Sequence, residues 1–294
     1  MEQGTVLRGI GGFYRVLLDN GRVVDCRPRG RLRLQPAGLL AGDRVDVSVL
    51  PDGTGAVEAV HPRRSRLRRP PVANVDRVVA VMALADPEPN LLLLDRLLTM
   101  AEASELDVLV CWTKADLAGR EQAERLAGLY RRAGYPAVVT SSRTGEGIEQ
   151  LQQALAGRLS TLAGPSGVGK SALLNALVPG LSRATGEVSR KLRRGRHTTR
   201  EVELLRLPRG GLVADTPGFS QLELTEIGKN RLGLLMRDIA RFAAECRFPG
   251  CLHRREPACS VRAAVDRGDI DRGRYRHYLI FLDEIEAWEA RRYS

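Results

Sequence analysis

The sequence has little lysine and no long apolar run. Only four of its 46 basic residues are lysines, and the others are arginines. No stretch of 18 or more apolar residues occurs, and the four leucines at 91–94 are followed at once by Asp95 and Arg96. A membrane-spanning helix needs about 20 apolar residues, so we expect none. The start of the chain lacks a basic stretch followed by an apolar core, so we expect no secretory signal and a cytoplasmic location.

The charge of the chain is strongly positive. The formal net charge is +11 at pH 7 and the sequence pI is near 10.0. A surplus of this kind is typical of proteins that bind phosphate backbones, so nucleic acid is the favoured partner. An arginine-rich genome explains the preference for Arg over Lys but not the surplus, and a merely soluble basic surface is the alternative. Two clusters, 63–69 (RRSRLRR) and 190–196 (RKLRRGR), make the surplus local.

Residues 4–60 have the pattern of short strands separated by turns. Apolar and polar residues alternate around an Asp-Asn-Gly turn at 19–21, a strong hairpin signal. Four or five such strands without a helical pattern predict a small closed β-barrel of the OB type, with another small β-module as the alternative. The basic, proline-containing run 63–74 is interpreted as a linker.

From Val75 onward, apolar strands alternate with helical patterns. The predicted strands cover 75–84, 106–112 and 158–163, and the predicted helices lie near 120–133 and 146–156. Alternation of this kind indicates βαβ units and a parallel sheet with both faces covered. We therefore expect an α/β nucleotide-binding core, followed after about residue 225 by a helical, charged segment.

A phosphate-binding loop follows the predicted strand 158–163 and opens a helix. Its sequence GPSGVGKS matches G-x-x-x-x-G-K-[ST], and the strand–loop–helix context supports the match. Backbone N–H groups of such a loop bind phosphates, Lys170 reaches the β/γ oxygens, and the Ser171 hydroxyl binds Mg²⁺. The predicted nucleotide-binding residues here are Gly164, Pro165, Ser166, Gly167, Val168, Gly169, Lys170 and Ser171.

Two further segments complete the predicted phosphate side. Asp215 ends an apolar strand in the sequence DTPG, where the carboxylate holds Mg²⁺ through water and the Gly218 N–H contacts a γ-phosphate. Between this strand and the loop lies HTTR, in which Thr198 and Thr199 are predicted to contact nucleotide, with Thr199 on Mg²⁺ as part of a switch. A basic loop without this role is the alternative.

The sequence TKAD at 113–116 is a candidate for reading the base. In this tetrad the Asp116 carboxylate accepts hydrogen bonds from the ring N–H and exocyclic amine of guanine, and the Lys114 stem packs along the base. Adenine leaves that carboxylate unpaired. After the next strand, Ser141 and Ser142 place a backbone N–H near guanine O6. Thr113 completes the predicted set, and a P-loop ATPase or kinase is the alternative that Asp116 disfavours.

Four residues near the end of the chain form a candidate metal site. Cys246, Cys251, His253 and Cys259 follow the spacing C-x4-C-x-H-x5-C. Three thiolates and one imidazole suit tetrahedral Zn²⁺, and unrelated reduced cysteines are the alternative. Cys26 and Cys111 stand apart and are interpreted as small buried hydrophobic residues, without disulfides.

The order of these motifs resembles that of the circularly permuted ribosome-assembly GTPases of the RsgA (YjeQ) type. TKAD and TSS precede GPSGVGKS, HTTR and DTPG, which is the hallmark of that family, and the resemblance covers nearly the whole chain. It implies a multidomain α/β protein with an N-terminal OB-type β-barrel and basic linker (1–70), a circularly permuted P-loop GTPase core (71–228) and a C-terminal helical zinc-binding domain (229–294).

The resemblance also implies a function. It implies a monomeric GTPase that binds GTP/GDP, Mg²⁺ and one Zn²⁺, and that binds the 30S ribosomal subunit and its 16S rRNA. Hydrolysis is then stimulated by the subunit during late small-subunit maturation. A non-catalytic RNA-binding adaptor that uses GTP as a structural ligand is the other alternative.

Two positions bear on the chemistry that the resemblance implies. Phe219 follows DTPG where Ras-like enzymes place a glutamine that orients water. The resemblance implies that a switch-region histidine, here His197, orients or deprotonates the water instead, with Lys170 as the second catalytic residue. A His197 that only contacts RNA is the alternative. Thr113 departs from the family, in which Asn is usual, and this leaves the strength of guanine binding open.

Overall fold

The computed structural model describes residues 1–30, 38–68, 71–181, 202–215, 224 and 227–292. The chain divides into two compact units, each made of three segments. The first comprises Met1–Arg77, Gln150–Leu162 and Leu174–Phe219, and the second comprises Val78–Glu149, Ala163–Leu173 and Ser220–Ser294. Among the described residues, no helix has both the length and the apolar character needed to cross a membrane.

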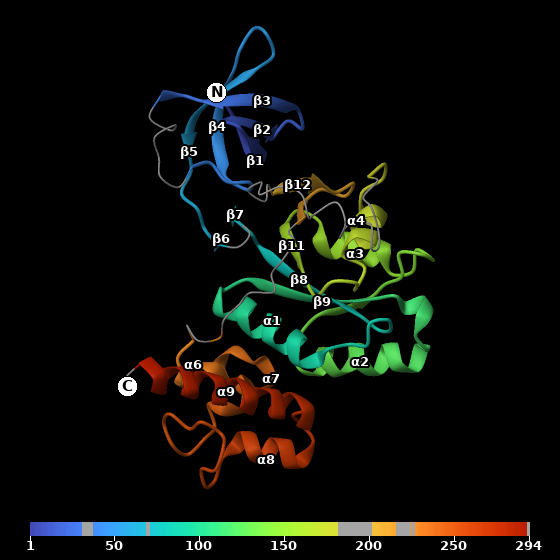
Figure 1. Cartoon of the computed structure of the whole chain (residues 1–294), viewed down its shortest axis with the longest axis vertical. Helices are drawn as coiled ribbons and strands as arrows, with labels where there is room; N and C mark the ends of the chain where they lie inside the picture. The colour runs from blue at the N-terminus through green and yellow to red at the C-terminus, as the bar shows by residue number, and fades with distance from the viewer. Residues whose placement is uncertain (31–37, 69–70, 182–201, 216–223, 225–226, 293–294) are drawn as a thin grey trace. The chain divides into compact units, whose positions relative to one another are not determined.

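A closed five-stranded barrel lies at the N-terminus (Figure 1). Its strand order is β1-β2-β3-β5-β4, with β3 and β5 parallel and the other neighbouring strands antiparallel. Along the central part of the strands alternate side chains point inward, and valines dominate the interior. The barrel predicted from the alternating pattern is confirmed. Its strands are β1 (Glu2–Ile10), β2 (Phe13–Leu18), β3 (Val23–Pro28), β4 (Arg44–Val49) and β5 (Gly55–Val60).

The run interpreted as a linker forms a small hairpin. Strands β6 (Arg66–Arg68) and β7 (Pro71–Ala73) pair antiparallel. Just before them, the Arg63 guanidinium donates to both oxygens of the buried Asp43 carboxylate, at 2.6 and 2.8 Å. Part of this basic run therefore has defined packing, because its arginine neutralises a buried acid of the barrel unit.

A six-stranded sheet forms the nucleotide-binding core, in the order β10-β9-β8-β11-β13-β12. The predicted alternation of strands and helices is confirmed, and β9–β10 and β11–β13 are parallel. The expectation of a wholly parallel sheet is wrong at one edge, where β12 pairs antiparallel with β13. Only a short turn joins these two strands, and a short turn forces antiparallel pairing. The strands are β8 (Arg77–Ala83), β9 (Asp107–Thr113), β10 (Ala137–Val139), β11 (Leu159–Ala163), β12 (Glu203–Arg206) and β13 (Leu212–Asp215).

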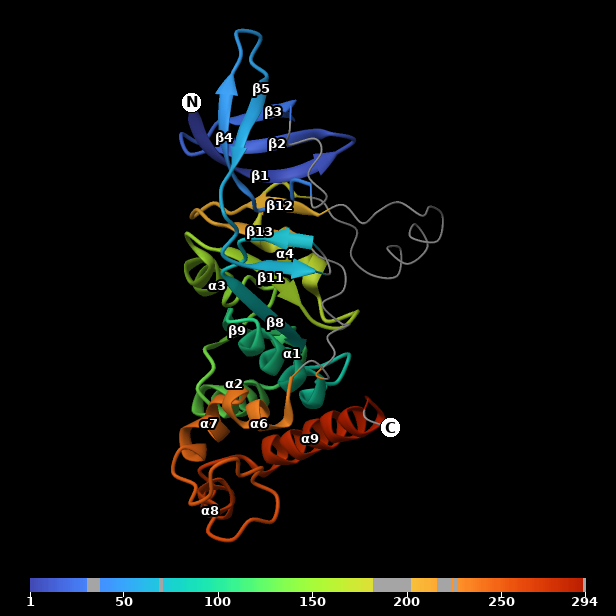
Figure 2. The ribbon, with the colours of Figure 1, turned by 90° about the vertical axis from the view of Figure 1, so that its left-hand side faces the viewer.

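Helices connect these strands and form the C-terminal part of the chain. In the second unit, α9 packs alongside α1 and α6 (Figure 2). The core helices are α1 (Leu91–Ala103), α2 (Arg120–Arg132), α3 (Ile148–Leu155) and α4 (Lys170–Leu177), with a 3-10 turn η2 (Ala115–Leu117). The C-terminal elements are α6 (Lys229–Leu232), η4 (Gly233–Leu235), α7 (Arg237–Ala243), α8 (Ser260–Arg267) and α9 (Arg272–Arg292).

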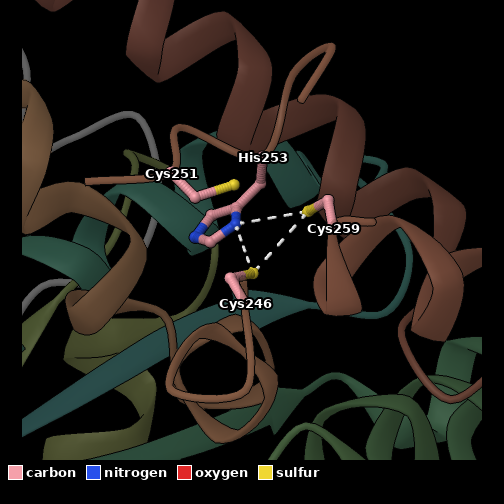
Figure 3. Close-up of side chains that lie close together, drawn as sticks. All are labelled: Cys246, Cys251, His253 and Cys259. Atoms are coloured by element: carbon pink, nitrogen blue, oxygen red, sulfur yellow. Dashed lines mark hydrogen bonds between the residues drawn. The ribbon is translucent and has the colours of Figure 1, made fainter. Parts of the chain in front are cut away.

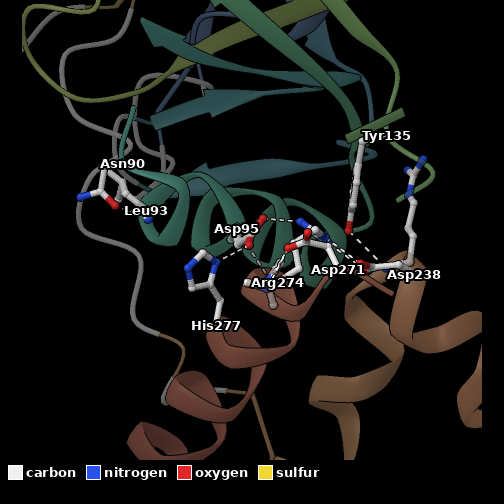
Figure 4. A network of polar contacts seen from close by, with 11 residues as sticks. Asn90, Leu93, Asp95, Tyr135, Asp238, Asp271, Arg274 and His277 are labelled. Carbon is white, nitrogen blue, oxygen red and sulfur yellow. Dashed lines mark hydrogen bonds and ion pairs between the residues drawn. The ribbon is translucent and has the colours of Figure 1, made fainter. Parts of the chain in front are cut away.

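A buried ion cluster joins α1 to the C-terminal helices (Figure 4). The Arg274 side chain of α9 is 2% exposed and donates to both oxygens of Asp238 of α7, at 2.7 and 2.8 Å. It also pairs with Asp95 of α1. His277 Nδ1 lies 2.6 Å from the other carboxylate oxygen of Asp95. Burial lowers the pKa of Arg274, but the two carboxylates outweigh it and hold that pKa well above its usual range. One buried guanidinium thus pairs with two buried carboxylates and joins the core to the C-terminal helices.

Candidate nucleotide site and metal centre

The phosphate-binding loop runs from β11 into α4, as its sequence predicts. A Cβ on Gly164 would lie 2.1 Å from the Val81 carbonyl oxygen, so only glycine fits there. Gly167 and Gly169 have φ values of +86° and +92°, a region that side chains other than glycine rarely adopt. The Lys170 amine donates to the carbonyl oxygens of Gly164 and Pro165, at 2.8 and 2.6 Å. Steric constraints thus require glycine at these three positions, and the Lys170 side chain lies over the loop.

Thr113 joins the base-reading loop to the phosphate loop. It is the last residue of β9 and is buried. Its hydroxyl Oγ1 donates to the Val168 carbonyl oxygen at 2.5 Å and lies 3.3 Å from the Met82 carbonyl oxygen. Thr113 therefore ties a strand end to a loop 55 residues later in the chain. Although Asn is usual at this position in the family that the motifs resemble, the threonine hydroxyl makes a specific contact to the phosphate loop.

Asp116 lies at the centre of the candidate base site. Its carboxylate oxygen Oδ1 accepts from the Ser141 hydroxyl at 2.5 Å, and Oδ2 lies 2.7 Å from Arg143 Nε. The Ser141 hydrogen bond, and then the charge of Arg143, lower the pKa of Asp116. Asp116 is therefore held as an anion, the form that accepts two hydrogen bonds from guanine.

The surrounding backbone holds the base site together. The Ala115 N–H donates to the Thr140 carbonyl at 3.1 Å, and the Thr140 N–H donates to the Trp112 carbonyl at 2.7 Å. Lys114 has φ +59°, and its amine donates to the Asp86 carbonyl oxygen. TKAD and TSS, which were predicted to read one base, therefore lie together because they end the neighbouring strands β9 and β10.

Arg143 is a site residue that no sequence motif indicated. It follows Ser142 directly, its side chain is 72% exposed, and its Nε faces Asp116. A cation immediately after the TSS sequence was the available signal. Such a signal is weak in a chain with so many arginines.

Several predicted residues cannot be compared with the structure. His197, Thr198, Thr199 and Gly218 lie outside the described residues. The backbone of Asp215 ends strand β13, but its side chain lies outside the described part of the chain. Ser171 lies in the first turn of α4. The roles given to these residues remain predictions.

The predicted metal ligands converge in the C-terminal part (Figure 3). The ligand atoms of Cys246, Cys251, His253 and Cys259 all lie within 4.8 Å of one another. His253 Nδ1 lies 3.5 Å from the sulfurs of Cys246 and Cys259, which are 3.8 Å apart. Three sulfurs around one imidazole nitrogen are a donor set that fits tetrahedral Zn²⁺.

The protonation of the cluster also fits a metal centre. Burial lowers the pKa of His253, which favours the neutral imidazole that binds metals. Burial raises the pKa of the Cys251 and Cys259 thiols, and a bound divalent cation offsets this effect by stabilising thiolates. The cluster thus has the chemistry of a structural zinc site.

The chain segment around His253 is held by the C-terminal helix. Tyr275 and Tyr278 of α9 donate through their hydroxyls to the carbonyl oxygens of His253 and Leu252, at 2.6 and 2.9 Å. The Glu256 carboxylate accepts backbone N–H bonds, including one from Leu252 at 2.8 Å. Burial acts to raise the pKa of Glu256, but the backbone bonds outweigh it and lower that pKa to about 2. The ligand loop is therefore positioned by groups other than the ligands.

The two isolated cysteines have the predicted role. Cys26 lies inside the barrel and Cys111 lies in strand β9, and both are buried and free. Burial raises the pKa of their thiols to about 11 and about 12, so both stay protonated near neutral pH. The interpretation as small buried hydrophobic residues is confirmed.

A P-loop after β11, preceded in the chain by a base-reading loop after β9, defines a circularly permuted GTPase. The family model described as RsgA GTPase matches residues 60–225, and the model described as RsgA N-terminal domain matches residues 3–57. The chain belongs to the RsgA family of GTPases.

Individual relatives match over nearly their full length. The chain is 52% identical to the small ribosomal subunit biogenesis GTPase RsgA of Moorella thermoacetica, over 98% of each chain. It is 46% identical to the protein of that name from Caldanaerobacter subterraneus, over 99% of this chain and 98% of the relative.

Solved structures have the same fold. The crystal structure of YjeQ from Thermotoga maritima superposes with a TM-score of 0.82 at 36% identity, over 97% of this chain and 98% of the other. YloQ, described as a circularly permuted GTPase, gives the same score and identity over 98% of this chain and 96% of the other. The chain thus shares its fold with these structures over nearly its whole length.

Proposed function

We propose that the chain hydrolyses GTP to GDP and phosphate during late maturation of the small ribosomal subunit, and that the 30S subunit stimulates this reaction. One observation supports the proposal above the others. The phosphate loop and the Asp116 loop are joined by the Thr113 hydroxyl, in a chain whose full-length relatives bear the name small ribosomal subunit biogenesis GTPase. A guanine nucleotide matches this site, because its phosphates fit the phosphate loop and its base fits the Asp116 loop.

On the phosphate side, the loop N–H groups bind the α- and β-phosphates, and the Lys170 amine reaches the β/γ oxygens. Ser171 and Thr199 hold Mg²⁺, and Asp215 supports the ion through water. A bound Mg²⁺ supplies charge neutralisation at the transferred phosphoryl group. His197 orients the attacking water, and the Gly218 N–H contacts the γ-phosphate. These roles follow from motif chemistry and from the position of Lys170 over the loop.

On the base side, the Asp116 carboxylate accepts the guanine N1–H and exocyclic amine. Lys114 packs along the base, and a backbone N–H at Ser141 or Ser142 meets guanine O6. The anionic state of Asp116 and its position beside Ser141 support this assignment. ATP presents an acceptor where guanine presents a donor, so the site disfavours it.

The C-terminal cluster holds one structural Zn²⁺ through Cys246, Cys251, His253 and Cys259. We propose an OB-fold domain with its basic linker at 1–70, a permuted GTPase domain at 71–228 and a zinc-binding helical domain at 229–294. A positive net charge of +11 supports contact with the 16S rRNA of the 30S subunit. The chain then acts as a cytoplasmic monomer.

GTP turnover with and without purified 30S subunits tests the proposal. We expect slow intrinsic hydrolysis that the subunit accelerates, with the acceleration falling as salt rises, because phosphate contacts release counterions. Lys170→Ala serves as the inactive control, and His197→Ala tests the catalytic residue. Nucleotide binding without turnover under either condition would support the adaptor alternative. Equal competition by ATP would support the ATPase alternative.

A further inference from the structure

The loop between Cys246 and Cys251 presents an aromatic side chain to solvent. Phe248 is 41% exposed, although large apolar side chains are usually buried. Leu234 of η4 is 65% exposed, and both residues line one pocket of about 380 Å³ next to the Cys/His cluster. The Phe248 ring is therefore open to a binding partner.

The loop is stiff at this point. The Cys251 N–H donates to the Phe248 carbonyl oxygen at 3.2 Å, which closes a four-residue turn. Pro249 occupies its second position and Gly250 its third, where φ is +75°, as a type II turn requires. The candidate metal ligands Cys246 and Cys251 bracket the turn. Phe248 is therefore presented on a rigid support, which lowers the entropic cost of binding a partner.

The charge around Phe248 is positive. The Arg247 guanidinium carbon lies 5.5 Å from the centroid of the Phe248 ring. Arg247 also lines the pocket, and none of the described residues lining it is acidic. Within the described part of the chain, Arg247 has no ion pair. The surroundings of Phe248 thus suit a polyanion that also carries flat aromatic groups able to stack on the ring.

The barrel carries a similar pair with different surroundings. Arg27 lies 4.4 Å from the centroid of Phe13, which is 52% exposed. The neighbouring arginines Arg15 and Arg29 are paired with acids, with nitrogen–oxygen distances of 3.3 and 2.7 Å. Charge complementarity to a polyanion is therefore stronger at the turn of the C-terminal module.

We propose that Phe248 stacks on an unpaired RNA base while Arg247 contacts the adjoining phosphate. The proposal rests on the proposed function, since it names the chemistry by which the C-terminal module recognises the RNA of its partner. An aromatic face beside a guanidinium is how proteins bind splayed bases, whereas base-paired RNA hides its faces. The site therefore selects single-stranded or looped RNA over duplex.

The test uses the full-length, zinc-loaded protein and a single-stranded RNA of about 12 nucleotides that carries one 2-aminopurine, a fluorescent base. Phe248→Leu keeps an apolar side chain of similar size but removes the ring. We expect it to weaken RNA binding about tenfold and to abolish the quenching of 2-aminopurine. Phe248→Trp restores both, and Leu234→Ala, which alters the same pocket, changes neither. Binding to a duplex of the same sequence changes little in any variant.

The outcomes separate this inference from the function on which it rests. Unchanged RNA affinity and quenching in Phe248→Leu would overturn the inference, whatever the GTPase assay shows. Equal losses of 30S affinity in Phe248→Leu and Leu234→Ala, with RNA binding intact, would indicate a protein-docking surface instead. Zinc content and GDP affinity verify that each variant is folded. Failure of the wild type to hydrolyse GTP with 30S subunits would contradict the proposed function but not stacking by Phe248.

Discussion

The nucleotide site and the Cys/His cluster are assembled in opposite ways. The nucleotide site collects residues from three separated segments, 113–116, 141–143 and 164–171, each of which follows a strand of one sheet. The cluster draws all four ligands from the 14 residues 246–259, in a segment with no strand among its described residues. The first site depends on sheet topology. The geometry of the Cys/His cluster depends on the spacing of its ligands and on the ion that they would bind.

Removal of the metal should have the largest effect, and this effect should be confined to the Cys/His cluster and the C-terminal helices. Structural zinc contributes about 10 kcal/mol or more to folding in zinc-finger peptides. We expect Cys251→Ala to lose bound zinc and the cooperative unfolding of the C-terminal helices, while GDP binding remains measurable. Metal analysis and circular dichroism check this result. Cys26→Ala, a buried cysteine of the barrel, should keep one zinc per chain, and full zinc occupancy in Cys251→Ala would contradict the assignment.

The ion cluster around Arg274 tests how the C-terminal helices are joined to the core. Arg274→Met leaves the buried Asp95 and Asp238 without their shared cation. We expect a loss of about 3–5 kcal/mol in the free energy of unfolding, because uncompensated buried charge is costly. Urea unfolding measures it. The matched control is Arg272→Met on the same helix, where the side chain is exposed and the loss should be small. Equal losses in both variants would show that the buried cluster has no special role.

Asp116→Asn changes the base that the nucleotide site accepts. Asparagine donates where aspartate accepts, so it cannot satisfy the exocyclic amine of guanine but can bond the C2 oxygen of xanthine. We expect GDP affinity to fall on the order of 100-fold and xanthosine diphosphate to bind in its place. Competition with a fluorescent nucleotide measures both. Asp107→Asn, at the exposed start of the same strand, is the control, and an unchanged preference for GDP would remove Asp116 from the base site.

Thr113→Val has the smallest expected effect and tests whether the two loops are energetically joined. Valine keeps the shape but removes the hydroxyl, so the Val168 carbonyl loses its partner. A lost bond of this kind costs about 1 kcal/mol, or roughly fivefold in GDP affinity. Thr99→Val removes a similar buried hydroxyl in α1 and should leave GDP affinity unchanged. Equal GDP affinity in Thr113→Val and wild type would show that the hydrogen bond does not contribute to nucleotide binding.

Local patterns predicted much of this architecture. The Asp-Asn-Gly turn and the alternating valines indicated the barrel, and GPSGVGKS indicated a strand–loop–helix unit. The hairpin of β6 and β7 was not predicted, because it packs against residues that are distant in the chain. The Ala73 N–H of β7, for example, donates to the Ala41 carbonyl oxygen at 2.9 Å. Strand β12 was missed because four residues are too short for a periodic pattern.

The sequence by itself determined which groups the protein has for its chemistry. Glycines that fit a phosphate loop, the TKAD tetrad, and the spacing of three cysteines and one histidine are local features, and local chemistry requires them. Only the tertiary structure decided which groups meet. Arg143 faces Asp116, the Thr113 hydroxyl bonds Val168, and Arg274 joins Asp95 to Asp238. Such contacts join segments far apart in the chain, and strand order and helix packing, not spacing, determine which residues come together.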